Sequence, residues 1–177
     1  MATHTNHVVP AFNFDDALQH TSDERVRLCV DNVRDRLFRG ELWCCFDIPP
    51  VPSSGATEEE LQRLESNLGV TLPGEYRLFL AHWRYLDLGF GRRIWGFDHQ
   101  GVSIGCPWTS DSHMVGTRYL VFADYWAYAD GDQLMFDLSN TRQEVTAYLH
   151  EHGPLLEAFA PSFSLALWRM VFEELDA

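Results

Sequence analysis

Four aspartates in the second half of the chain are the acidic residues whose spacing could support binding chemistry. Asp130 and Asp132 flank Gly131, which predicts the tip of a β-hairpin, whereas Asp124 and Asp137 lie near the opposite strand ends. The spacing does not fit a calcium loop, which needs ligands at alternate positions and a late Glu. Either the aspartates hydrogen-bond the backbone of their own turn, or they form an acidic edge for a basic partner.

No set of residues predicts a covalent nucleophile. Such a site needs a nucleophile on a sharp turn beside a base, and the chain has no Gly-x-Ser-x-Gly elbow. Ser103 lies between Val102 and Ile104, as is typical of a strand. Cys29 falls on the apolar face of a predicted helix, where thiols are usually inert. We therefore expect no catalytic nucleophile and assign no catalytic residue, and an enzyme of another type is the alternative to a binding role.

Two further patterns could bind a metal or a phosphate. His150 and His152 would share one face of a strand, but only Asp137 or Glu151 could complete the site, and nothing fixes them nearby. The loop 89–93 (GFGRR) lacks the Lys-Ser/Thr of a P-loop and precedes a predicted strand. We favour surface histidines and a loop whose arginines can pair with acidic residues, and we expect no metal and no other cofactor.

Aromatic residues supply the apolar half of a possible interface. The chain has 12 Phe, 6 Trp and 6 Tyr, more than a small core must bury. Trp95, Trp126 and Tyr128 are predicted in loops or near strand ends, where aromatics beside acidic groups suit recognition hot spots. The alternative is that they pack in the core. The predicted contact residues are Asp124, Asp130, Asp132, Asp137, Trp95, Trp126 and Tyr128.

Charge limits the class of partner. The chain holds 26 acidic and 13 basic residues, all arginine, for a net charge of −13. Residues 111–177 contain 11 of the acidic residues and only 3 of the arginines. This charge repels nucleic-acid phosphates and attracts basic proteins. The alternative is that acidity only maintains solubility.

Length and composition predict a single domain of 177 residues that can bury a sizeable core. No apolar run approaches the 18 residues of a membrane span, and the N-terminus lacks the pattern of a secretory signal. The four cysteines have no Cys-x-x-Cys spacing, so we expect reduced thiols and a cytoplasmic protein.

Glycine and proline positions, together with changes in composition, divide the chain into four segments. The segments are a flexible N-terminus (1–22), an N-terminal helical extension (23–46), a Pro-rich linker (47–56) and the main domain (57–177). In the extension, Ser22 or Asp23 could cap a helix that runs to about Phe38 and ends at Gly40. Its expected buried face is Val26, Cys29, Val30, Val33 and Leu37.

The main domain opens with two amphipathic helices. Thr57 and Glu60 predict a capping box, and Gly69 suits the left-handed end of the first helix. Pro73 suits the first turn of the second helix. The second helix has one apolar face, formed by Tyr76, Phe79, Leu80 and Trp83.

Strands are expected in the middle of the chain and a deeply packed helix at its end. The predicted strands cover 92–97, 118–123, 133–138 and 144–150, with a loop over 106–116 and a connector over 155–159. The last helix is expected over 162–174. These elements favour an α+β fold with a mixed, mostly antiparallel sheet, flanked by N-terminal helices and a C-terminal helix.

Three segments resemble the SUKH superfamily, in its Smi/Knr branch. The first is Glu65 with Leu68-Gly69, Leu72-Pro73, Tyr76 and Phe79-Leu80. The others are Gly131–Asp137 and Ala160–Phe163, so the resemblance spans about 55–175. The family often has Asn-Gly after the second helix, where this chain has RYLDLG.

The resemblance implies a SUKH-like fold and a non-enzymatic binding role. Many bacterial members resemble cytoplasmic immunity proteins that bind a cognate polymorphic toxin domain, and fungal relatives regulate cell-wall synthesis. We therefore expect this chain to bind and occlude a basic toxin domain, with no nucleic-acid or membrane partner and a monomeric state favoured. The alternative is a Smi/Knr-type scaffold or regulator that binds a peptide or small ligand.

Overall fold

The computed structural model describes residues 11–42, 51, 54–89, 91–97, 108–112, 117–126, 130–139, 143–150 and 155–173. Several predictions lie outside these residues, namely those for residues 1–10, Cys44, Cys45, Ser103, Cys106, Tyr128, Glu151 and His152. Within the described ranges, no helix is both long enough and apolar enough to cross a membrane.

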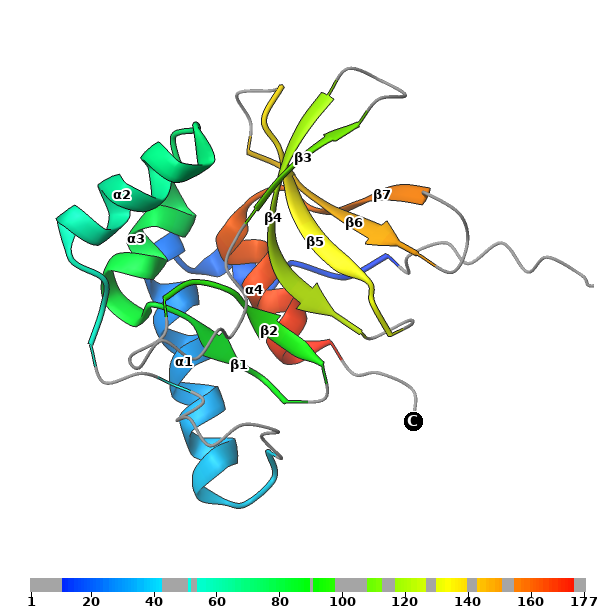
Figure 1. Ribbon diagram of the computed structural model, residues 1–177. Helices are drawn as coiled ribbons and strands as arrows, with labels where there is room; N and C mark the ends of the chain where they lie inside the picture. The colour runs from blue at the N-terminus through cyan, green and yellow to red at the C-terminus, as the bar shows by residue number, and fades with distance from the viewer. Residues whose placement is uncertain are drawn as a thin grey trace, which may run out of the picture.

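The described strands form one antiparallel sheet (Figure 1). The strands are β1 (Leu86–Asp87), β2 (Arg92–Ile94), β3 (Trp108–Ser112), β4 (Thr117–Tyr125), β5 (Gln133–Asp137), β6 (Val145–Leu149) and β7 (Leu155–Ala160). Their order is β1-β2-β4-β5-β6-β7, with β3 paired to the other part of β4, and every pair is antiparallel. The predicted α+β class is confirmed.

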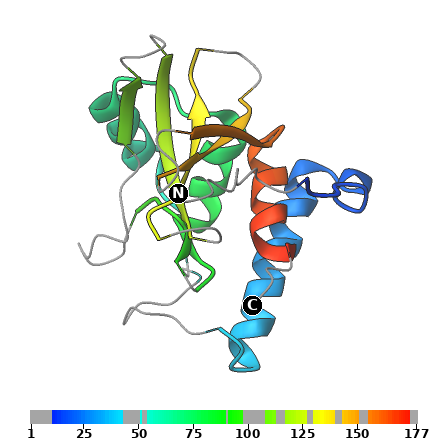
Figure 2. The same cartoon turned by 90° about the vertical axis from the view of Figure 1, so that its right-hand side faces the viewer.

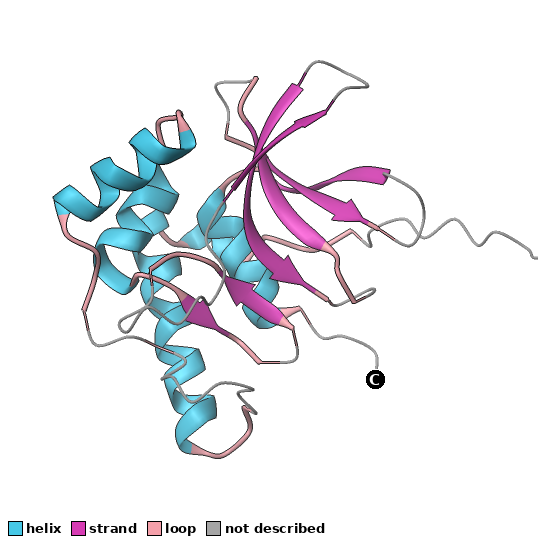
Figure 3. Cartoon of the chain, in the orientation of Figure 1, coloured by secondary structure: helices cyan, strands magenta, loops and turns pink. Residues whose placement is uncertain are grey.

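Helices lie beside this sheet as a separate layer (Figure 3). They are η1 (Ala17–Gln19), α1 (Ser22–Phe38), α2 (Glu58–Leu68), α3 (Gly74–Trp83) and α4 (Phe163–Phe172). Helices α1 and α4 run side by side (Figure 2). The Nε of Arg25 in α1 donates to the Ser164 hydroxyl of α4 at 2.9 Å, so the N-terminal ends of the two helices meet.

The main core is aromatic and joins α3, α4 and the central strands. Tyr76 is fully buried, and its ring contacts those of Phe122, Phe136 and Phe163 at centroid distances of 5.4, 5.7 and 5.4 Å. The Tyr76 hydroxyl donates to the Trp95 carbonyl at 2.7 Å, so its polar atom is satisfied. Each fully buried ring contributes about 1.5–3 kcal/mol. This core fixes the helix pair against the sheet.

Helix α1 begins at a different cap from the predicted one. Thr21, rather than Ser22 or Asp23, is the N-cap, because Glu24 three residues later completes a capping box with it. The Ser22 hydroxyl instead donates to Glu75 on α3. The predicted face is buried at Val26, Cys29, Val30 and Val33, while Leu37 is exposed near the end of the helix.

The helix pair forms largely as its sequence predicts. The Thr57–Glu60 capping box is present, and Gly69 has a φ of +65° at the end of α2. Pro73 is the N-cap of α3 rather than a residue of its first turn. Arg84, which follows α3, donates to both carboxylate oxygens of Glu60 and so ties the two helices together.

The sheet differs from its prediction at both edges and at one turn. The predicted loop over 106–116 contains β3, and the predicted connector over 155–159 is β7. Both strands form by pairing with a neighbour, β4 or β6, and neither alternates apolar with polar residues. Strand β4 ends at Tyr125 and β5 begins at Gln133, so the connection is longer than a two-residue hairpin turn. Among the described residues of this connection, Gly131 has a positive φ, of +99°, and Asp130 does not.

Candidate functional site

The hairpin of β4 and β5 separates the predicted aspartates into two groups. Asp124 pairs with Gln133 at the end that carries the connecting loop, near Asp130 and Asp132. Asp137 pairs with Tyr119 at the other end of the pairing, roughly 13 Å away along β5. The four aspartates therefore do not form one cluster.

Asp132 is buried in the hairpin and binds the residue that follows β6. Its side chain is only 3% exposed, and its Oδ1 accepts the His150 backbone N–H at 2.9 Å and lies 3.2 Å from His150 Nδ1. Within the described part of the chain, its buried Oδ2 has no hydrogen-bond partner. The His150 ring lies against Gly131, where a Cβ atom would come within 3.2 Å of it. Asp132 thus links the hairpin to the end of β6 rather than to the backbone of its own turn.

Asp124 and Trp95 form a second half-buried pair. Trp95 is 6% exposed, and its Nε1–H donates to Asp124 Oδ2 at 3.1 Å. Arg93 lies 3.8 Å from the same oxygen and 4.0 Å from Asp87. Burial raises the pKa of Asp124, although the Trp95 hydrogen bond and the Arg93 charge oppose it. The pairing expected between the arginine-bearing loop and acidic residues is confirmed for Arg93.

Arg92, the other arginine of that loop, faces the helices. One guanidinium nitrogen donates to the Met170 carbonyl of α4 at 3.1 Å. Burial lowers the pKa of Arg92. Its side chain therefore joins the sheet to α4, and it is placed for packing rather than for binding a phosphate.

Asp137 binds its own turn. Its Oδ1 accepts hydrogen bonds from the Ser139 backbone N–H at 2.8 Å and from the Ser139 hydroxyl at 2.5 Å. Such a short-range pattern is characteristic of an aspartate that stabilises a turn. The side chain is nevertheless half-exposed.

Of the predicted contact residues that the structure describes, Trp126 and Asp130 are exposed, and we call them the hairpin surface. Trp126 is 42% exposed and its backbone N–H donates to the Gly91 carbonyl at 3.3 Å. A Cβ atom at Gly91 would lie 2.3 Å from the Trp126 ring, so the indole rests on a bare backbone. Asp130 is exposed at the turn.

The described residues contain neither a reactive cysteine nor a group that could bind a metal ion. Cys29 is fully buried in α1, and burial raises the pKa of its thiol, which disfavours the reactive thiolate. No group of three or more His, Cys, Asp and Glu side chains in the described ranges could hold a metal ion.

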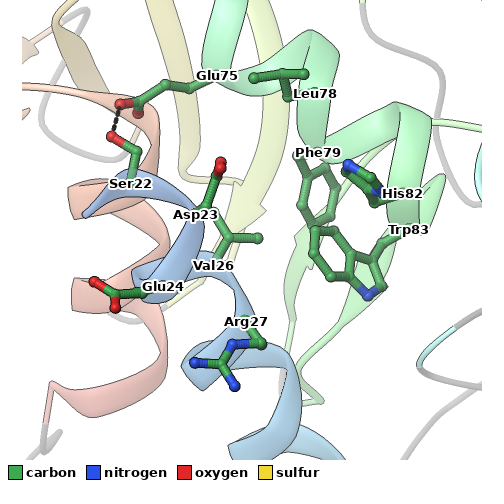
Figure 4. A pocket seen from close by; sticks show the side chains of 10 residues that line it. All are labelled: Ser22, Asp23, Glu24, Val26, Arg27, Glu75, Leu78, Phe79, His82 and Trp83. Atoms are coloured by element: carbon green, nitrogen blue, oxygen red, sulfur yellow. Dashed lines mark hydrogen bonds between the residues drawn. The ribbon is translucent and has the colours of Figure 1, made fainter. Parts of the chain in front are cut away.

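A groove between α1 and α3 was missed by the sequence reasoning (Figure 4). It encloses about 270 Å³ and has an apolar floor of Val26, Phe79 and Trp83, with Leu78 at one end. Leu78 is 54% exposed, because it lies off the buried face of α3. An apolar residue at this position could have indicated the groove from the sequence, since an amphipathic helix normally places a polar residue there.

Glu75 closes the floor of this groove and joins three helices. One carboxylate oxygen accepts the Ser22 hydroxyl of α1 at 2.5 Å, and the other accepts the Ser164 backbone N–H of α4 at 2.8 Å. Burial acts to raise the pKa of Glu75, but these hydrogen bonds outweigh it and hold the pKa below its usual value. One charged carboxylate beside the groove therefore links α1, α3 and α4.

Comparison with known proteins agrees with this fold. The model of the SMI1 / KNR4 family (SUKH-1) matches residues 55–167, which include α2, α3 and every described strand of the sheet. No curated protein and no solved structure matches the chain. At the family level the match supports a protein-binding domain of the immunity type. The chain belongs to the SMI1 / KNR4 family (SUKH-1).

Proposed function

We propose that this protein is an immunity protein that binds a cognate polymorphic toxin domain in the cytoplasm and occludes its active cleft. The observation that carries the proposal is the hairpin surface, where the β4–β5 connection presents an exposed tryptophan, Trp126, and an exposed aspartate, Asp130. Tryptophan is a frequent hot-spot residue, and the net charge of −13 favours encounter with basic proteins.

The proposed contact residues have two kinds of role. Trp126 and Asp130 touch the partner directly, together with Tyr128 from the same connection. Asp124, Asp132 and the buried Trp95 hold that end of the hairpin in place by hydrogen bonds. Asp137 adds charge at the distant end of the sheet.

Inhibition would follow from occupation rather than chemistry. Carboxylates can take the place of the substrate phosphates that a basic nuclease cleft recognises, and an aromatic side chain can fill apolar space beside them. The immunity protein then needs only a stable surface of the right charge and shape. The family match supports this non-enzymatic role.

A co-purification experiment tests the proposal. The tagged chain is co-expressed with the product of the adjacent gene, and the captured complex is washed with increasing salt. Capture should weaken as salt rises and should weaken further in the Trp126→Ala/Asp130→Asn double variant. The matched control is Phe38→Ala/Asp31→Asn, which removes an exposed aromatic and an exposed acid from α1 and should leave capture unchanged.

The alternative is a Smi/Knr-type regulator that binds a peptide or small ligand, and the α1–α3 groove favours it. Such a ligand would enter an apolar groove, so its binding should tolerate salt. Capture that ignores salt and the hairpin variants would favour this second function.

A further inference from the structure

The α1–α3 groove combines an apolar floor with an exposed apolar edge. Figure 4 shows Val26 from α1 facing Phe79 and Trp83 from α3, with Leu78 beyond them. The volume of about 270 Å³ lies just below that of small-molecule sites, which span roughly 300–1,000 Å³. It suits one or two side chains better than a cofactor.

The charges around the groove are unequal and select a cation. The Glu24 carboxylate already accepts from the Thr21 backbone N–H at 2.8 Å, and its charge faces that of Arg27. Asp23 has neither a hydrogen bond nor an ion pair among the residues that the structure describes, and it lies on the rim. The groove is thus lined by the carboxylates of Asp23, Glu24 and Glu75 against the single guanidinium of Arg27, so an incoming positive group would meet net negative charge next to the apolar floor.

The family match covers one wall of the groove and not the other. Helix α3 lies inside the family match over residues 55–167, whereas α1 lies before it. Helix α1 is nevertheless firmly seated, because Ser22 and Arg25 bind Glu75 and Ser164. One wall of the groove thus lies outside the residues that match the family model.

We propose that the α1–α3 groove is a second docking site for the partner protein and receives an apolar side chain flanked by a lysine or arginine. This inference rests on the proposed protein-binding function. The apolar side chain packs on Phe79, Trp83 and Leu78, and the cation pairs with Asp23. Charge complementarity selects this occupant over an acidic or purely apolar segment.

The test uses two small probes that carry the same apolar group and opposite charges. The full chain is titrated with 4-phenylbutylamine and with 4-phenylbutyrate, and binding is followed by methyl NMR signals of Val26 and Leu78. The amine should bind in the millimolar range, at least about threefold more tightly than the acid. Asp23→Asn should remove that preference, and Leu78→Ser should weaken both probes.

Phe38→Ser is the matched control, because Phe38 is 93% exposed at the far end of α1 and should not affect either probe. Equal binding of the two probes, no saturable binding, or signals that move only outside the groove would overturn the inference. So would a dimer in sedimentation experiments that Leu78→Ser dissociates, since the occupant would then be a second copy of the chain.

Capture of the adjacent gene product separates the two proposals. Leu78→Ser should weaken the complex about tenfold while the hairpin surface is intact. If Leu78→Ser binds that product as tightly as the wild type, the inference fails although the proposed immunity function stands. If no product is captured by any variant, the immunity function fails and the partner role of the groove fails with it.

Discussion

The carboxylate of Glu75 on α3 accepts the backbone N–H of Ser164 at 2.8 Å, so a side chain of the family's helix pair caps the last helix. The first N–H groups of a helix have no intrahelical partner, and a charged acceptor satisfies one of them well. The same carboxylate accepts the Ser22 hydroxyl of α1. One residue therefore links the extension, the helix pair and the C-terminal helix.

Glu75→Gln is expected to lower the free energy of unfolding by about 1–3 kcal/mol, because an amide can accept only one of the two hydrogen bonds. Its folded-state pKa is lowered, so its contribution is present above the unfolded-state value of about 4.5 and is lost as pH falls through the lower folded value. Urea denaturation at pH 7 and at lower pH should show the difference between variant and wild type shrinking.

Glu59→Gln is the matched control for Glu75, because Glu59 is an exposed glutamate in the first turn of α2. It should change stability by only a few tenths of a kcal/mol. Equal effects of the two substitutions would contradict the linking role of Glu75.

Asp124→Asn is expected to keep or raise stability at pH 7, in contrast to the loss expected for Glu75→Gln. Burial raises the folded-state pKa of Asp124 despite Trp95 and Arg93, so its contribution is fully present below its unfolded value of about 3.8 and is lost as pH rises through the folded value. An asparagine can still accept the Trp95 Nε1–H without a buried charge. Stability at pH 7 should stay the same or rise by up to about 1 kcal/mol. A clear loss would mean that the Arg93 ion pair outweighs burial.

Gly91→Ala should displace the Trp126 ring of the hairpin surface, although Gly91 itself is not a proposed contact residue. Gly91 has a φ of +71°, and an added Cβ would lie 2.3 Å from the Trp126 ring. We expect a loss of about 1–3 kcal/mol, a change in tryptophan fluorescence and weaker partner binding. Gly74→Ala is the control, because no atom lies within 4 Å of its added Cβ and it begins α3. That variant should be as stable as the wild type or more so.

Substitutions of Asp132 should affect stability, whereas substitution of Asp130 should affect partner binding. Asp132→Ala removes the acceptor of the His150 N–H and should cost about 1–3 kcal/mol, whereas Asp132→Asn keeps that acceptor and should cost less. Asp130→Asn should leave thermal unfolding unchanged and weaken only the complex. Calorimetry would measure the melting of these variants, and titration would measure their binding. If Asp132→Asn weakened the complex and Asp130→Asn did not, Asp132 rather than Asp130 would contact the partner.

Local patterns predicted the parts of the fold that local forces determine. The capping box of Thr57 and Glu60, the left-handed Gly69 and the buried alternation of Val145, Ala147 and Leu149 all appear in the structure. The edge strands β3 and β7 did not follow from the sequence, because pairing with a neighbour, not alternation, defines them.

The candidate site was only partly predictable for a related reason. The sequence identified Asp132 and Trp95 as interesting residues, but whether a turn aspartate or a tryptophan faces solvent depends on tertiary packing. The structure buries both and leaves Trp126 exposed. The α1–α3 groove depends on two helices about 50 residues apart in sequence, and only Leu78 on a polar face hinted at it.

The most direct test of the central claim is the inhibition of the isolated toxin domain by the purified chain, titrated at low and at high salt. The proposal predicts complete inhibition at a one-to-one ratio, with affinity that falls as salt rises. The Trp126→Ala/Asp130→Asn variant should bind at least about tenfold more weakly, equivalent to about 1.4 kcal/mol. An uninhibited toxin, or inhibition that neither salt nor the double substitution weakens, would contradict the proposed function.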